Sequence, residues 1–161
     1  MTKKKAFRVL SMIYIISLGG ILGATIYAGA VVAPNIFHSE LLLGKEILSQ
    51  YQEGIIMTAN FEKLGVVVNI LVFFVLFYES IKWKNFESDR WVLISAFLFI
   101  SSGLLFSSFY IPSIIEMQLQ GEAVTASETF KNMHFASELD FKLFAFATLA
   151  LLILNLKKAL R

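Results

Sequence analysis

The sequence predicts an all-α polytopic membrane protein with four transmembrane helices. Of its 161 residues, 57% are hydrophobic and only 16% are charged, whereas an average soluble domain carries about 25% charged residues. Four apolar stretches run through the chain, and they lack the alternation of apolar and polar residues that is typical of a β-barrel. The basic residues gather on one side of these stretches, which predicts how the chain crosses the membrane.

Two of the apolar stretches are long enough to span a bilayer on their own. Residues 9–33 and 91–115 each contain 25 residues without a charge, more than the roughly 20 that a helix needs to cross about 30 Å of hydrocarbon. The stretches at 64–78 and 143–156 contain only 15 and 14 such residues, so polar residues at their ends must also enter the membrane. We therefore expect one integral membrane domain, residues 1–161, with spans at about 9–33, 58–82, 91–113 and 134–157.

The charges that flank the spans predict that both termini lie in the cytoplasm. Ten of the 14 basic residues precede the first span, lie between the second and third, or follow the fourth, while nine of the 12 acidic residues lie on the other side. Because lysine and arginine are retained in the cytoplasm, we expect an antiparallel four-helix bundle in a bacterial inner membrane, with an acidic outer side. A cleaved signal peptide is the alternative for the first stretch, although its apolar run is long for such a segment.

The first outer connection is expected to begin at Pro34, because proline ends or kinks a helix. Ser39 and the leucines that follow it, up to Gln50, predict a short amphipathic helix on the outer surface. No internal repeat is apparent in the sequence. The lipid bilayer is the expected partner, and the net charge of +2 gives no reason to expect nucleic acid.

The first span carries two stripes of small residues that predict close helix packing. Gly19 and Gly23 form a GxxxG pattern, and Gly20, Ala24 and Ala28 recur at four-residue spacing. Such stripes serve either packing within the bundle or the docking of a second copy or of another membrane protein.

Charged residues at the outer ends of the two short spans form the main candidate ligand site. They are Glu62 and Lys63 in the second span and Glu138, Asp140 and Lys142 in the fourth. Because a charge in hydrocarbon needs a partner, we expect Lys63 to pair with Glu138 or Asp140, Glu62 with Lys142, and Glu138 with Lys142 one turn away. Two interpretations stay open, a salt-bridge rim that fixes the bundle and a site for a ligand or ion. At the inner ends, the charged side chains are expected to extend to the membrane surface, namely Glu79, Lys82, Lys157 and Lys158.

The two histidines, His38 and His134, both fall on the expected outer side. His134 lies one turn before Glu138, a spacing at which an imidazole and a carboxylate can share a metal ion. We therefore name His38, His134 and Glu138 as a candidate metal site, with simple solvation of both imidazoles as the alternative. The chain has no cysteine and no HExxH, P-loop, GxGxxG or GxSxG motif, so we predict no catalytic residue and assign no cofactor.

Two short segments carry a family resemblance. The stretch from Gly23 to Phe37 combines a helix rich in small residues with Ala-Pro-x-x-Phe, and the stretch from Phe130 to Ser137 reads Phe-x-x-x-His-x-x-Ser. Both resemble an uncharacterised bacterial four-helix membrane family, a domain-of-unknown-function family related to the eukaryotic transmembrane-protein-205-like proteins. Relatives carry an asparagine where this chain has Phe141. The resemblance implies roles for Pro34, Phe37, His134 and Ser137, and the link of its eukaryotic branch to metal-drug tolerance implies a transport or metal function.

Together these patterns predict a small, non-enzymatic inner-membrane protein that binds or moves a small cationic or metal ligand at an outward-facing polar site. The candidate ligand contacts are His134, Glu138, Asp140, Ser137, Glu62, Lys63 and Lys142. The alternative is a structural or accessory subunit of a membrane complex that docks through the glycine stripes. A haem-binding membrane oxidoreductase is a third hypothesis, weakened because the first span contains no histidine.

Overall fold

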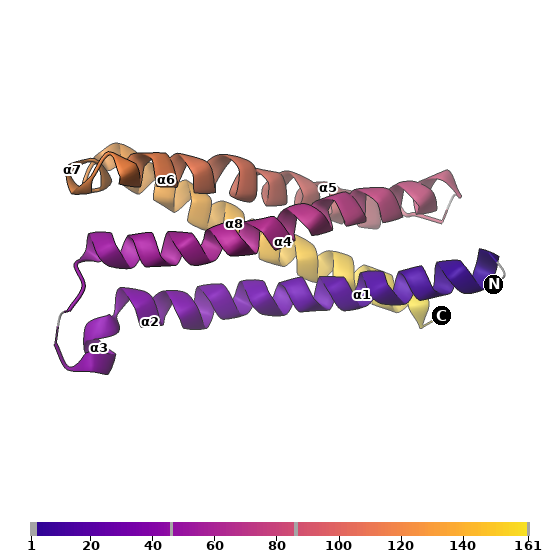
Figure 1. Ribbon diagram of the computed structural model, residues 1–161. Helices are drawn as coiled ribbons and strands as arrows, with labels where there is room; N and C mark the ends of the chain where they lie inside the picture. Colours follow the sequence, from indigo (N-terminus) through magenta and orange to yellow (C-terminus); the bar gives the residue numbers. More distant parts are fainter. Residues whose placement is uncertain (1–2, 46, 86, 161) are drawn as a thin grey trace.

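The computed structural model describes residues 3–45, 47–85 and 87–160, and within these ranges every regular element is a helix. Four helices are long and apolar enough to cross a membrane, and they are Lys5–Phe37, Gln50–Lys84, Arg90–Leu119 and Glu128–Ala159. They form an elongated bundle with both chain termini at one end and the short helices α3 (Ser39–Leu43) and α7 (Glu122–Thr125) at the other (Figure 1). The prediction of an all-α chain with four membrane helices is confirmed. We refer to the two ends as the terminal end and the α3/α7 end.

The first and third membrane helices each have three segments, an α-helix, one π-helix and a second α-helix, whereas the second and fourth are uninterrupted. The segments of the first are α1 (Lys3–Tyr27), η1 (Ala28–Val32) and α2 (Ala33–Phe37). The segments of the third are α5 (Arg90–Leu105), η2 (Phe106–Tyr110) and α6 (Ile111–Leu119). The second and fourth are α4 (Gln50–Lys84) and α8 (Glu128–Ala159).

Two prolines account for the π-helices. Pro34 and Pro112 are each the second residue of the α-helix after a π-helix, so the carbonyl four residues earlier, at Ala30 or Ser108, lies within the π-helix. In an α-helix the proline ring would clash with that carbonyl and could not donate a hydrogen bond to it, and the wider π turn accommodates this misfit. Of the two effects expected at Pro34, an end or a kink, the structure excludes the end, because the first membrane helix continues past Pro34 to Phe37.

The two halves of the chain repeat the same order of elements, which corrects the expectation of a chain without internal repeats. Three features recur 78 residues later in the chain. The π-helix starts at Ala28 and again at Phe106, the proline is Pro34 and then Pro112, and the serine that caps the next long helix is Ser49 and then Ser127. Buried positions of α1 and α5 recur with the same offset, namely Tyr14, Leu18 and Ile21 against Val92, Ala96 and Phe99. The repeat was not apparent in the sequence because the two halves share their backbone geometry and burial pattern rather than their residue identities.

The core runs along the inside of the bundle. Phe99 of α5 and Phe144 of α8 are fully buried, and their ring centroids lie 4.8 Å apart. Nearer the α3/α7 end, aromatic rings from α4, η2 and α8 meet at centroid distances of 5.5, 5.1 and 4.8 Å, and they belong to Phe61, Phe106 and Phe141. These contacts fix the distances between the long helices at two levels of the bundle.

The glycine stripe of α1 faces away from the rest of the chain. A Cβ added to Gly19, Gly20 or Gly23 would meet no atom of another described part of the chain within 4 Å. Ala24 is also exposed, and Ala28 is half-buried. Packing within the bundle therefore does not account for the three glycines.

The surface helix that follows the first membrane helix is shorter than the sequence suggested. It is α3, which ends at Gly44, whose φ of 70° places it in the left-handed region that glycine adopts readily. Helix α4 then begins with a capping box, in which Ser49 and Gln52 exchange hydrogen bonds. Three exposed leucines lie on α3, at positions 41–43.

We expect Gly103→Leu to destabilise the bundle. A Cβ at this position would lie 2.9 Å from Val72 Cγ2 and 3.1 Å from Phe144 Cε2, and such overpacking costs about 1–3 kcal/mol. The matched variant Gly19→Leu adds the same side chain at a position where a Cβ has no described neighbour within 4 Å, and it should leave stability unchanged. Thermal unfolding in detergent measures both, and an equal loss in the two variants would contradict the tight contact of α5 with α4 and α8.

Candidate functional site

A cleft of about 580 Å³ at the α3/α7 end brings together residues that are far apart in the sequence. The turn between α2 and α3 contributes His38, the start of α4 contributes Glu53, and α8 contributes His134. Phe37, Glu40 and Gln50 also line it. Two imidazoles and two carboxylates therefore border one cavity.

Glu53 is the most buried acidic residue of the cleft. Its carboxylate oxygen Oε1 accepts a hydrogen bond of 2.6 Å from the hydroxyl of Ser39, the first residue of α3. This hydrogen bond joins α3 to the start of α4, and both of its side chains are buried. Glu53 therefore presents a carboxylate held in a fixed position.

The two histidines have different surroundings. His134 lies between two aromatic rings, stacked on Phe130 at a centroid distance of 6.2 Å and edge-on to Phe37 at 6.5 Å. Nδ1 of His38 lies 3.7 Å from Oε1 of Glu40, and both of these side chains are largely exposed. His134 is also exposed, and it differs from His38 in having two aromatic rings beside it.

The charged residues of the predicted rim make different contacts from those expected. Lys142 donates to Oε1 of Glu138 at 2.6 Å, the intrahelical pair that the sequence suggested. Within the described ranges, Lys63 pairs with neither Glu138 nor Asp140, and Glu62 does not pair with Lys142. The reason is helical phase, because residues 138 and 142 share an exposed face of α8 whereas residue 140 points about 200° away, towards the bundle.

Asp140 and Ser137 are buried on the bundle side of α8. Ser137 donates to the carbonyl of His134 at 2.7 Å. Among the described residues, Asp140 Oδ2 is the one buried side-chain nitrogen or oxygen without a hydrogen-bond partner. An ionisable side chain without a partner inside a membrane bundle is costly and is a hypothesis for a functional position, so Asp140 is kept as a candidate although it does not line the cleft.

The candidate metal site is not assembled as the sequence suggested. His38 and His134 border the same cleft, but Glu138 is engaged with Lys142. In the part of the chain that the structure describes, no group of three histidine, cysteine, aspartate or glutamate side chains is placed to hold a metal ion.

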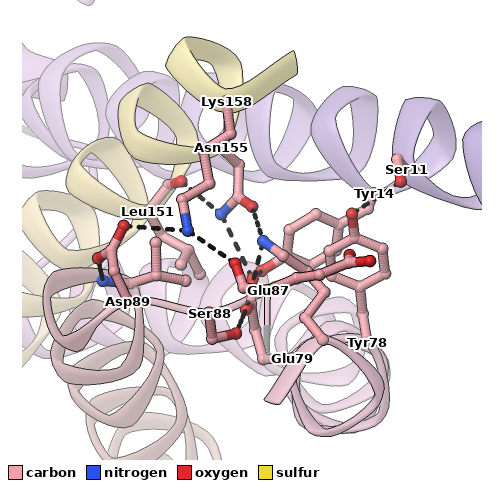
Figure 2. A network of polar contacts seen from close by, with 12 residues as sticks. Ser11, Tyr14, Tyr78, Glu79, Glu87, Ser88, Asp89, Leu151, Asn155 and Lys158 are labelled. Carbon is pink, nitrogen blue, oxygen red and sulfur yellow. Dashed lines mark hydrogen bonds and ion pairs between the residues drawn. The ribbon is translucent and has the colours of Figure 1, made fainter. Parts of the chain in front are cut away.

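At the terminal end, a buried polar network joins α1, α4 and α8 (Figure 2). Glu79 Oε1 accepts hydrogen bonds from the Tyr14 hydroxyl at 2.9 Å and from the Asn155 amide at 3.3 Å. Lys82 donates to Asn155 Oδ1 at 2.6 Å and lies 3.6 Å from Glu79 Oε2. Glu79 and Lys82 are 4% and 5% exposed, so the expectation that they reach the membrane surface is wrong.

The reason for this difference is the partner set, which the sequence did not make evident. A buried ion pair persists when further hydrogen bonds satisfy its remaining lone pairs and protons, and Tyr14 and Asn155 supply them here. One sequence feature could have predicted this network. Asn155 lies near the inner end of the fourth span, at the level where the second span carries Glu79 and Lys82, three residues apart.

A second group of contacts lies beside this network, in the turn between α4 and α5. Lys158 lies 3.0 Å from Asp89 Oδ2 and donates to the carbonyl of Glu87 at 3.0 Å (Figure 2). Asp89 also caps α5 by accepting from the backbone N–H groups of Trp91 and Val92. The hydrogen bond from Lys158 and those from the backbone hold the pKa of Asp89 below its usual value.

A family model for a domain of unknown function, DUF4149, matches residues 16–123. The chain belongs to the DUF4149 family. The matched residues run from α1 into α7 and include both π-helices, whereas α8 with His134 and Asn155 lies beyond them. Neither the curated proteins nor the solved structures contain a match to the chain.

For this DUF4149 protein, we expect Tyr14→Phe to lower the free energy of unfolding. The change removes the shorter of the two hydrogen bonds to Glu79 Oε1 and leaves the buried carboxylate less well satisfied, at a cost of about 1–3 kcal/mol. Tyr27→Phe is the matched control, because Tyr27 is exposed on the same helix. Thermal unfolding in detergent compares the two, and a Tyr14→Phe protein as stable as the control would show that Glu79 does not depend on this donor.

Proposed function

We propose that the protein binds a small organic cation in the cleft at the α3/α7 end, and that it is not an enzyme. The observation that carries the proposal is the convergence of Glu40, Glu53, His38 and His134 on one cavity of about 580 Å³. Such a cavity falls within the usual size range of small-molecule sites.

The chemistry of the lining favours a positively charged ligand. The two glutamates supply negative charge, and the Ser39 hydrogen bond keeps the Glu53 carboxylate in place. Phe37 offers an aromatic ring to the same cavity, and cations are attracted to the faces of such rings. An ammonium or guanidinium group can donate to the carboxylates and to Gln50 while it contacts this ring.

An organic cation suits the cleft better than a tightly coordinated metal ion. A bound metal usually takes three or more protein ligands at about 2.0–2.6 Å, and the described residues hold no such group. Hydrogen bonds and charge attraction tolerate the wider spacing of these side chains.

The direction in which the cleft faces follows from charge. With most basic residues at the terminal end, the positive-inside rule places both termini in the cytoplasm and the cleft on the outer side of a bacterial inner membrane, in an antiparallel bundle. Asp140 lies six residues, about 9 Å of helix, further into the membrane than His134. In the transport function that the resemblance to transmembrane-protein-205-like proteins implies, this buried carboxylate is a second candidate contact for the cation.

The test is binding of ethylammonium, choline and agmatine to the protein in lipid nanodiscs, read as a thermal shift. Saturating ligand stabilises the folded state by about 2.7 kcal/mol at a hundredfold excess over Kd, and Glu53→Gln should remove the shift because a neutral amide cannot pair with a cation. Glu138→Gln is the matched control, since it removes the same charge outside the cleft.

Three results would contradict the proposal. They are no shift with any of the three cations, a shift that survives Glu53→Gln combined with Glu40→Gln, and a shift with Zn²⁺ or Cu²⁺ alone. The last result would restore the metal hypothesis built on His38 and His134.

A second candidate function is that of a subunit that docks a membrane partner through α1. The specific observation is the open face over Gly19, Gly20 and Gly23, where an added Cβ would have no atom of another described segment within 4 Å. Small residues on a lipid-facing helix allow a second helix to pack closely, and a second copy of this chain is the simplest partner.

If α1 docks a second copy, Gly23→Leu should convert a dimer into a monomer. The bulky side chain would keep the two helix backbones apart, and Ile16→Leu, on the exposed side of the same helix, is the matched control. Molecular mass from light scattering with detergent correction measures the change. A wild-type monomer at all protein concentrations would count against self-association.

A further inference from the structure

A second cavity, of about 370 Å³, lies between α4 and the segment formed by η2 and α6. We call it the α4/α6 groove, and its lining includes Glu62, Val66 and Asn69 of α4 and Ser107, Ile115 and Glu116 of η2 and α6. Two exposed apolar residues, Val66 and Leu119, are also part of its walls. The groove is therefore open to the side, where a membrane helix meets lipid.

Gly65 allows α4 to approach η2 and the start of α6 closely. A Cβ on Gly65 would lie 3.2 Å from Ile111 Cδ1 and 3.4 Å from Ser107 Cβ, so the missing side chain allows the two segments to touch there. One turn further in, the hydroxyl of Ser107 lies 2.7 Å from both the Asn69 side-chain oxygen and the Gly103 carbonyl. This contact gives the groove a polar end at the level of the hydrocarbon.

The opposite end of the groove is acidic. Glu62 and Glu116 are both exposed, and neither forms an ion pair or side-chain hydrogen bond with a residue that the structure describes. Glu62 lies seven residues from Asn69 and Glu116 nine from Ser107, so each carboxylate is about 10–14 Å of helix from the polar end. Negative charge at one end and apolar walls along the length define the shape and polarity of a ligand.

We propose that the α4/α6 groove binds a lipophilic amine dissolved in the bilayer. Its ammonium group pairs with Glu62 and Glu116, and its alkyl chain lies along Val66 and Ile115 towards Asn69. Charge complementarity selects this occupant, because two unpaired carboxylates attract a cation and repel the phosphate of an ordinary phospholipid. The groove is separate from the cleft that holds His38 and His134, since the two share no lining residue.

The test uses decylammonium as the probe, with the protein in phosphatidylcholine nanodiscs and binding to empty nanodiscs subtracted. Decanol and decanoate are the matched probes, because they have chains of the same length but carry no charge or a negative charge. We expect saturable binding of decylammonium alone. The double variant Glu62→Gln/Glu116→Gln should weaken it by about 10- to 100-fold, as the loss of charge-assisted hydrogen bonds does.

Two further variants locate the bound amine in the groove. Val66→Trp places bulk in the groove at a lipid-exposed position, and it should abolish binding while the fold is kept. Glu122→Gln removes an exposed carboxylate outside both cavities and should leave the affinity unchanged. These variants are compared in a Glu53→Gln background, which removes ammonium binding at the cleft, so the decylammonium binding that is left reports on the groove.

Several results would overturn the proposal. Equal binding of decanol would mean that the acidic end has no part in recognition, and loss of decylammonium binding in Glu53→Gln would move the site to the cleft. A wild-type dimer that Val66→Trp dissociates would mean that a second copy of the chain occupies the groove. Absence of saturable decylammonium binding to the wild type would refute the groove as an amine site.

Discussion

The buried carboxylate of Glu79 is the constraint on which the terminal end of the bundle depends. A charge among membrane helices is stable only with partners, and Glu79 finds them on α1, α4 and α8. The rotations of three helices are therefore coupled, because turning any one of them would remove a donor. The ion pair between Asp89 and Lys158 extends the same coupling to the turn that leads into α5.

The α3/α7 end is built on a different principle. Here each half of the chain carries a π-helix followed by a proline, and a short helix then leads into the next long helix. The short helices α2 and α3 contribute Phe37 and Glu40 to the cleft, and Ser107 of η2 lines the groove, which runs from this end towards the middle of α4. The buried polar network thus lies at the terminal end, and both proposed binding sites lie in the half of the bundle towards the α3/α7 end.

The carboxylates at the α3/α7 end have distinct environments. Glu53 is held by Ser39, Glu138 is paired with Lys142, and Glu62 shares a groove with Glu116. Asp140 lies deeper and keeps an oxygen without a partner. The charged cluster expected at the ends of the two short spans is therefore divided among different surroundings, and Glu53 and Glu116, which were not part of that expectation, line the cleft and the groove.

The sequence by itself determined the all-helical class and the presence of four membrane helices, because the lipid environment permits few ways to satisfy the backbone of long apolar stretches. It also identified the Glu138–Lys142 pair, which depends only on spacing along one helix. Only the tertiary structure decided which residues meet across helices: that Glu79 joins Tyr14 and Asn155, that His38 shares a cleft with His134, and that Asp140 turns inward. These contacts depend on the rotation of each helix about its axis, and the almost uniform apolarity of a membrane helix leaves that rotation poorly encoded in the sequence pattern.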